Sequence, residues 1–136
     1  CLEGRRLLLA EDNDLNAEIA ATILEGDGAY VSIVGDGAQA VEAFAANPEG
    51  TFDAILMDVV MPKMDGLAAT RAIRALDRPD AASIPIIAMT GNAFQEDVRE
   101  CLRAGMNAHI AKPVDLAKAG RVIAKAVAGV RPPLKS

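Results

Sequence analysis

Short apolar runs alternate with longer amphipathic segments along the whole chain. The runs are rich in Leu, Ile, Val and Met and have the length of buried strands. After each run, apolar residues recur at the spacing of a helix with one buried face. The pattern predicts strands at residues 5–10, 30–34, 53–57, 84–89 and 107–111. It predicts helices at about 14–25, 38–46, 67–76, 94–104 and 115–128.

The first predicted helix shows how the two ends of such a segment are recognised. Asp14 precedes the apolar residues and is a suitable cap for the helix N-terminus. Leu15, Ile19, Ile23 and Leu24 then recur at helical spacing, as in an amphipathic helix.

Regular alternation of strand and helix with short connections predicts an α/β domain with a parallel sheet and helices on both faces. A flavodoxin-like doubly wound (βα)5 sandwich, with a five-stranded sheet in the order 2-1-3-4-5, fits this pattern best. We expect residues 1–130 to form the domain and residues 131–136 to form a tail or linker.

Composition narrows the class of protein. The 136 residues suffice for one domain, and with 51% hydrophobic but only 3% aromatic residues the core must be aliphatic. A net charge of -5 argues against nucleic-acid binding by this domain. Two cysteines, no signal peptide and no membrane-spanning run favour a cytoplasmic domain without membrane contact. The chain begins at Cys1 rather than Met, which suggests excision from a longer parent chain that could be membrane-anchored.

Polar side chains follow four of the five predicted strands. They are Glu11 and Asp12 after the first strand, Asp58 after the third, Thr90 after the fourth and Lys112 after the fifth. Parallel strands all end at the same edge of a sheet, where ligands bind in open α/β folds. We therefore expect these side chains to converge. Each alone has an ordinary explanation, such as a solvated loop for the acids, a helix cap for Thr90 and a surface position for Lys112.

Three carboxylates side by side repel one another unless a cation joins them. An all-oxygen ligand set suits Mg²⁺. A magnesium ion, an open carboxylate, a hydroxyl group and a lysine together meet the needs of phosphoryl transfer. The strand ends therefore predict a Mg²⁺-dependent phosphoryl site with Asp58 as the nucleophile.

Four segments in order, LLLAEDN, ILMDVVMPKMDG, AMTGNA and HIAKP, resemble the receiver domain of two-component response regulators. The resemblance covers nearly the whole chain. It implies that Asp58 is the phosphoacceptor for a phosphohistidine and that Asp12 and Asp58 bind Mg²⁺ directly. The backbone carbonyl of Val60 would be a third ligand, and Glu11 would act through a metal-bound water.

The resemblance also assigns the phosphoryl oxygens and the switch. Thr90 would donate a hydrogen bond to the phosphoryl group and Lys112 would pair with it, with a cis peptide between Lys112 and Pro113. The family often has Tyr or Phe three residues before that lysine, whereas this chain has His109. Phosphorylation would move Thr90 and reshape the face of the fourth helix, fifth strand and fifth helix, where Phe94, Val98 and His109 are the positions of interest.

The segments EDNDLNAEIA and NAFQEDVRECLRAGMNAHIAKPVD are most similar to receiver domains within hybrid sensor histidine kinases. That similarity implies two partners, a histidine kinase phosphohistidine domain and a histidine phosphotransfer domain. It also implies that any kinase activity lies elsewhere in a parent chain. A stand-alone single-domain response regulator and a phosphate-independent interaction module are the alternatives.

Two other functions fit the fold class less well. A haloacid-dehalogenase-type phosphohydrolase needs a second Asp two residues after the first, where this chain has Val60. A flavodoxin-type flavin module needs a hydroxyl- and glycine-rich phosphate loop after the first strand. The four residues 11–14 are EDND instead, and they would repel a phosphate.

Overall fold

The computed structural model describes residues 2–59, 64–90, 95–111 and 115–129. Within these ranges five strands alternate with five helices, and their ends lie within two residues of the predicted ones. The strands are β1 (Arg6–Ala10), β2 (Tyr30–Val34), β3 (Ala54–Asp58), β4 (Ile86–Thr90) and β5 (Ala108–Ala111). The helices are α1 (Asp14–Glu25), α2 (Gly37–Ala46), α3 (Gly66–Arg74), α4 (Gln95–Ala104) and α5 (Leu116–Gly129). A 3₁₀-helix, η1 (Pro79–Ala81), which the sequence pattern did not predict, precedes β4.

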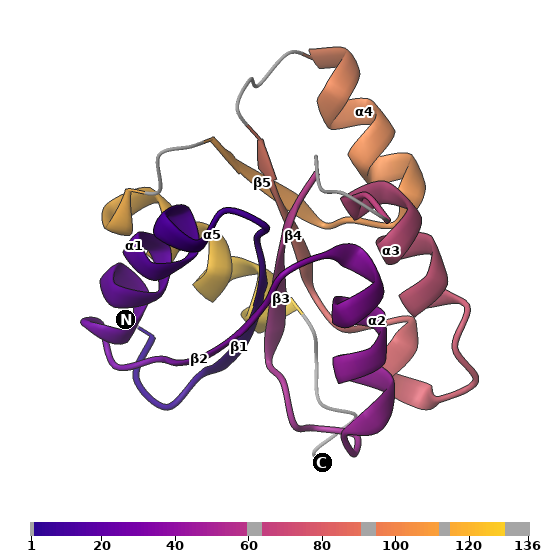
Figure 1. Ribbon diagram of the computed structural model, residues 1–136, viewed down its shortest axis with the longest axis horizontal. Coiled ribbons are helices and arrows are strands. Elements are labelled where there is room, and N and C mark those ends of the chain that lie inside the picture. Colours follow the sequence, from indigo (N-terminus) through magenta and orange to yellow (C-terminus); the bar gives the residue numbers. More distant parts are fainter. Residues whose placement is uncertain (1, 60–63, 91–94, 112–114, 130–136) are drawn as a thin grey trace.

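The strands form one parallel sheet in the order β2-β1-β3-β4-β5, as predicted (Figure 1). The chain crosses from one side of β1 to the other between β2 and β3, so the switch in strand order falls between β1 and β3. All five carboxyl ends lie at one edge of the sheet, called here the carboxyl edge. The opposite edge, where the strands begin, is called the amino edge.

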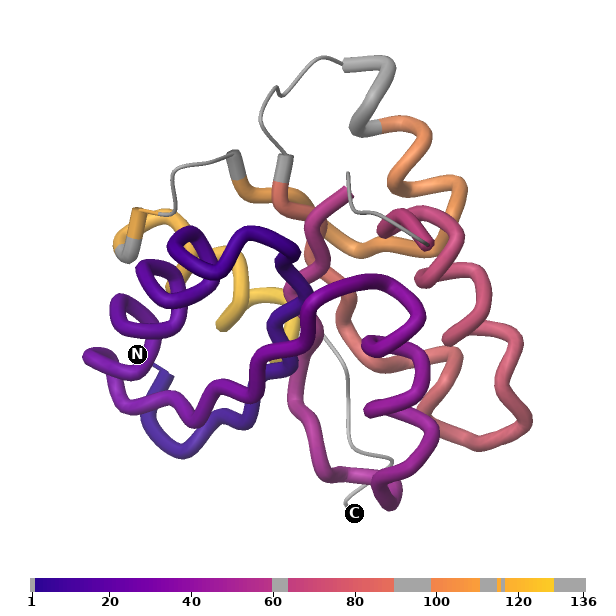
Figure 2. Tube along the Cα trace, viewed as in Figure 1, coloured from indigo at the N-terminus to yellow at the C-terminus, as the bar shows by residue number. Residues whose placement is uncertain are grey.

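Two hydrophobic cores lie on the two faces of the sheet because successive strand residues point to opposite sides. Leu7 and Leu9 contribute to the core beneath α1 and α5, whereas Leu8 and Ala10 contribute to the core beneath α2, α3 and α4. Helices α1 and α5, the first and last of the chain, lie side by side on one face (Figure 2). Among the described residues, no helix combines the length and apolarity needed to cross a membrane.

Helix α1 differs from its prediction in two respects. Asn13, not Asp14, is the N-cap, because its side-chain oxygen accepts a hydrogen bond of 2.9 Å from the backbone N–H of Asn16. The large residues Leu15 and Ile19 are exposed, at 64% and 47% of their surface. The buried face consists of small residues and one leucine, namely Ala17, Ala20, Ala21 and Leu24.

Two arginines bind backbone carbonyl groups at the amino edge. Arg74, at the end of α3, donates to the carbonyl oxygen of Gly105 through Nε and Nη2, at 3.0 and 2.7 Å. It also donates to the Ala81 carbonyl oxygen and to Oδ1 of Asn107, which in turn accepts the N–H of Ile86. Burial lowers the pKa of the Arg74 guanidinium. This side chain thus joins α3, η1, the α4–β5 connection and the start of β4.

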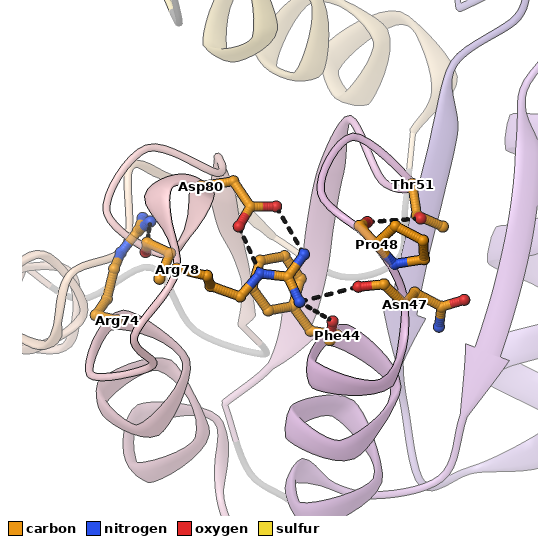
Figure 3. Close-up of polar contacts among 8 residues, drawn as sticks. Phe44, Asn47, Pro48, Thr51, Arg74, Arg78 and Asp80 are labelled. Carbon is orange, nitrogen blue, oxygen red and sulfur yellow. Dashed lines mark hydrogen bonds and ion pairs between the residues drawn. The ribbon is translucent and has the colours of Figure 1, made fainter.

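Arg78 closes the neighbouring corner of the same edge (Figure 3). Its guanidinium lies 4.4 Å from the centre of the Phe44 ring and donates to the carbonyl oxygens of Phe44 and Asn47, each at 2.9 Å. Asp80 accepts two hydrogen bonds from the same group, and this contact raises the pKa of Arg78. The end of α2 is thereby fixed to the segment that follows α3.

Candidate metal centre

Glu11 is the first of the predicted site residues, and the turn after β1 fixes its position. Its backbone N–H donates to the Val34 carbonyl oxygen at 3.1 Å, which extends the pairing of β1 with β2 by one residue. Its side chain is buried, and Oε2 accepts the N–H of Asn13 at 3.1 Å. Because Asn13 also caps α1, one residue fixes both the acid and the start of the helix. Sequence analysis missed this role, although Asn is among the most favoured capping residues.

Asp58 is the last residue of β3, the central strand of the sheet. It pairs with Met89 of β4, and the next residue, Val59, donates its N–H to the Met89 carbonyl oxygen at 3.2 Å. The Asp58 side chain is only 4% exposed. The strand pairing therefore holds this carboxylate at the carboxyl edge of the sheet, on the strand between β1 and β4.

The structure brings Glu11, Asp12 and Asp58 together as predicted. One carboxylate oxygen from each residue lies within 4.8 Å of the other two. Glu11 and Asp58 are buried, whereas Asp12 is exposed and faces solvent. Three hard oxygen ligands at such spacing suit a small divalent cation, with water completing its coordination shell on the open side.

The remaining predicted residues are placed only in part. Thr90 is the last residue of β4 and pairs with Ala111 of β5, so its backbone lies at the same edge, one residue beyond the partner of Asp58. Val60, Lys112 and Pro113 lie outside the described residues, so their predicted roles remain predictions.

His109 lies in the middle of β5 and is partly buried. Its neighbours Ala108 and Ile110 belong to the core beneath α1 and α5. His109 therefore points to the opposite face of the sheet, the one that α4 covers. Its predicted partners in the switch, Phe94 and Val98, are not part of what the structure describes: residue 94 and the side chain of residue 98 lie outside it.

The connection after Asp58 returns to the sheet through a closely packed helix start. Asp65 caps α3 by accepting the N–H of Ala68 at 2.8 Å. The first helical residue, Gly66, donates its N–H to the Val59 carbonyl oxygen at 2.9 Å. The residue after Asp58 and the first residue of α3 are thus joined directly beside the phosphoacceptor candidate.

Most of the chain is similar in sequence to known proteins. Residues 7–124 match the family described as response regulator receiver domain. The chain is 38% identical to Histidine kinase 1 of Arabidopsis thaliana over 84% of its own length, and 39% identical to the sensor protein GacS of Pseudomonas syringae over 88%. The chain spans only 12% and 13% of the lengths of these two relatives.

Solved structures give the same result. The receiver domain of a sensor histidine kinase from Pseudomonas aeruginosa is 41% identical, with a TM-score of 0.81 over 92% of this chain and 98% of that one. That crystal structure has a magnesium ion coordinated in its active-site cleft. A chemotaxis protein from Vibrio cholerae, 22% identical with a TM-score of 0.81 over 90% of this chain and 98% of that one, shares the fold.

Proposed function

Because the chain belongs to the response regulator receiver domain family, we propose that Asp58 accepts a phosphoryl group from a phosphohistidine, with Mg²⁺ as cofactor. The observation that carries the proposal is the cluster of Glu11, Asp12 and Asp58 at the switch point of the sheet. An open α/β sheet binds its ligands at this point. A single exposed acid would not suffice, but two buried carboxylates beside a third form an all-oxygen ligand set of the kind that Mg²⁺ favours.

The residues present fit a magnesium ion. Asp12 and Asp58 would be direct ligands, Glu11 would hold a metal-bound water, and the backbone carbonyl of Val60 would complete the protein ligands. When bound, Mg²⁺ neutralises the clustered carboxylates and the oxygens of the incoming phosphoryl group. Glu11 is well suited to a fixed role because the Asn13 N–H already holds its carboxylate.

In the proposed transfer, a carboxylate oxygen of Asp58 attacks phosphorus in line with the phosphohistidine nitrogen. The new P–O bond gives an acyl phosphate, the P–N bond breaks, and the histidine ring leaves with its bonding electron pair. Thr90 would donate a hydrogen bond to the transferred group, and Lys112, joined to Pro113 by a cis peptide, would pair with it. Movement of Thr90 would then pass to His109 and the face formed by α4, β5 and α5.

The exposed residues of α1 suit docking of the phosphohistidine partner. Leu15 and Ile19 lie four residues apart on the solvent side of the helix, so they form a ridge that packs into the groove of another helix. The ridge begins three residues after Asp12, and Asp14 and Glu18 on the same helix are exposed acids. We assign the ridge to a helical phosphohistidine domain with apolar residues flanked by basic ones, because such a partner would bring its histidine to Asp58.

The similarity to histidine kinases supports a place within a hybrid kinase. Its phosphoryl donor would be a histidine kinase domain, and a histidine phosphotransfer domain would receive the group next. The domain would catalyse only its own phosphorylation and dephosphorylation, because position 60 is Val rather than the second Asp of a phosphohydrolase. The cytoplasmic location predicted from the two cysteines belongs to this proposal.

Transfer from a protein donor tests the proposed function. A panel of autophosphorylated histidine kinase cores would be mixed with the chain, and both proteins followed by intact mass with time. We expect loss of phosphate from at least one kinase and gain of one phosphoryl group on the chain, dependent on Mg²⁺ and absent in Asp58→Asn. Binding of a kinase without any transfer would instead support a phosphate-independent interaction module.

A further inference from the structure

The connection between Asp58 and α3 has two described ends, and a glycine at the start of a helix contacts each one. Gly66, the first residue of α3, donates its N–H to the Val59 carbonyl oxygen. Gly37, the first residue of α2, donates its N–H to the Met64 carbonyl oxygen at 3.1 Å. Helix α2 carries none of the predicted site residues, so its contact with this connection has no counterpart in the proposed function.

Gly37 leaves no room for a side chain. A Cβ atom there would lie in steric overlap with the Met64 carbonyl oxygen, 2.9 Å from the Met64 carbonyl carbon and 3.1 Å from Cβ of Ala69. Two of these three atoms belong to the backbone, so no change of rotamer would relieve the overlap. Gly37 does not have the positive φ angle that requires glycine elsewhere in the chain. The constraint is therefore the close approach of two backbone segments.

The start of α2 is also held from its own side. The side chain of Asp36 is buried and caps the helix by accepting the N–H of Gln39 at 2.8 Å. Ala40 and Phe44 fix the rest of the helix in the core beneath α2, α3 and α4. The position of α2 against Met64 is thus fixed by its N-terminal cap and by its buried side chains.

We propose that Gly37 is a positioning residue for the metal centre. By allowing α2 to lie directly against Met64, it fixes the chain two residues before Gly66, whose N–H holds the Val59 carbonyl beside Asp58. This inference rests on the proposed function, because it assigns Gly37 a role in Mg²⁺ binding. A bulkier residue would push Met64 away from α2 and disturb the contact of Gly66 with Val59, and with it the position of the Asp58 carboxylate.

The test compares Mg²⁺ affinity in three alanine variants, measured by titration of backbone amide signals in NMR. Gly37→Ala is expected to weaken Mg²⁺ binding at least tenfold. Gly35→Ala, two residues earlier, meets only the Gln39 side-chain oxygen at 3.4 Å, and Gly120→Ala in α5 meets nothing within 4 Å. Both controls should bind Mg²⁺ as the wild type does. Thermal unfolding of each variant reports any loss that is merely structural.

The outcomes separate this inference from the proposed function. If the wild type binds no Mg²⁺, the proposed function fails. If the wild type and Gly37→Ala bind Mg²⁺ equally well, the proposed function stands and the positioning role of Gly37 is wrong. A Gly37→Ala variant that is less stable but has unchanged Mg²⁺ affinity would also overturn the inference.

Hydrogen exchange in the wild type gives a second measurement that needs no variant. The Gly37 amide donates to the connection, so Mg²⁺ should slow its exchange at least threefold relative to the Gly26 amide. Gly26 is a suitable reference because its N–H donates to Thr22 within the end of α1, away from the connection. Equal effects of Mg²⁺ on the two amides would contradict the role proposed for Gly37.

Discussion

The carboxyl and amino edges of the sheet differ in how their charged side chains are arranged. At the carboxyl edge three acids lie together, and two of them are buried. At the amino edge Arg74 and Arg78 bind carbonyl groups of α2, η1 and the α4–β5 connection. Like charges oppose folding, whereas hydrogen bonds from a charged donor to carbonyl groups favour it. Charged donors secure the fold at one edge, and the other edge holds the acidic cluster that we propose binds Mg²⁺.

Among the charged residues of the two edges, removal of Arg74 should cause the largest loss of stability. Arg74→Ala leaves the Gly105 carbonyl, the Ala81 carbonyl and the Asn107 side chain without this donor. We expect the free energy of unfolding in urea, followed by circular dichroism, to fall by about 3 kcal/mol. Arg71→Ala, an exposed arginine on the same helix, should change it by less than about 0.5 kcal/mol. Equal losses of unfolding free energy in the two variants would show that the Arg74 hydrogen bonds do not stabilise the amino edge.

At the carboxyl edge, Mg²⁺ should reverse the effect of Asp12→Asn on the free energy of unfolding. Without Mg²⁺, Asp12→Asn relieves repulsion from Glu11 and Asp58 and should raise the free energy of unfolding by about 1 kcal/mol. Mg²⁺ at ten times its dissociation constant should stabilise the wild type by about 1.4 kcal/mol. The variant should gain much less. Thermal and urea unfolding with and without Mg²⁺ check both effects.

Asp77→Asn is the matched control, because Asp77 is exposed and lies outside the acidic cluster. It should follow the wild type in both conditions. An Asp12→Asn protein that is less stable than the wild type without Mg²⁺ would show that the clustered acids do not oppose folding.

The smallest effect on stability is expected in the first turn of α1, which begins at the carboxyl edge. Leu15→Gln should change the free energy of unfolding by less than about 0.5 kcal/mol because the side chain is 64% exposed. Leu24→Ala, on the buried face of the same helix, should cost about 3 kcal/mol. Leu15→Gln should nevertheless slow phosphoryl transfer from a protein donor at least tenfold and leave modification by phosphoramidate unchanged. Equal slowing with both donors would argue against a docking role.

The fold could be predicted because it follows from local pattern. Apolar runs bounded by turn residues gave all five strands, and the alternation gave a parallel sheet. The site could be predicted as well, because the carboxyl ends of parallel strands must lie at one edge of the sheet. Glu11, Asp12 and Asp58 are adjacent because, in addition, β1 and β3 are neighbours in the sheet order.

Other features had no local signal. Asn13 and Asp14 are both good caps, so only the geometry of the turn distinguishes them. The burial of Ala17 and Ala21 instead of Leu15 reflects how closely α1 approaches the sheet, and small residues allow that approach. Arg74 binds partners up to 33 residues away, and Gly37 contacts Met64 across two elements. Such contacts depend on the finished fold.

The most direct test of the central proposal is intact-mass analysis after incubation with phosphoramidate, with and without Mg²⁺. Wild type, Asp58→Asn and the control Asp77→Asn would be treated in parallel. The account predicts one added phosphoryl group on the wild type and on Asp77→Asn, only with Mg²⁺, and none on Asp58→Asn. A phosphoryl group added to Asp58→Asn at the wild-type rate, or added to the wild type at an equal rate without Mg²⁺, would contradict it.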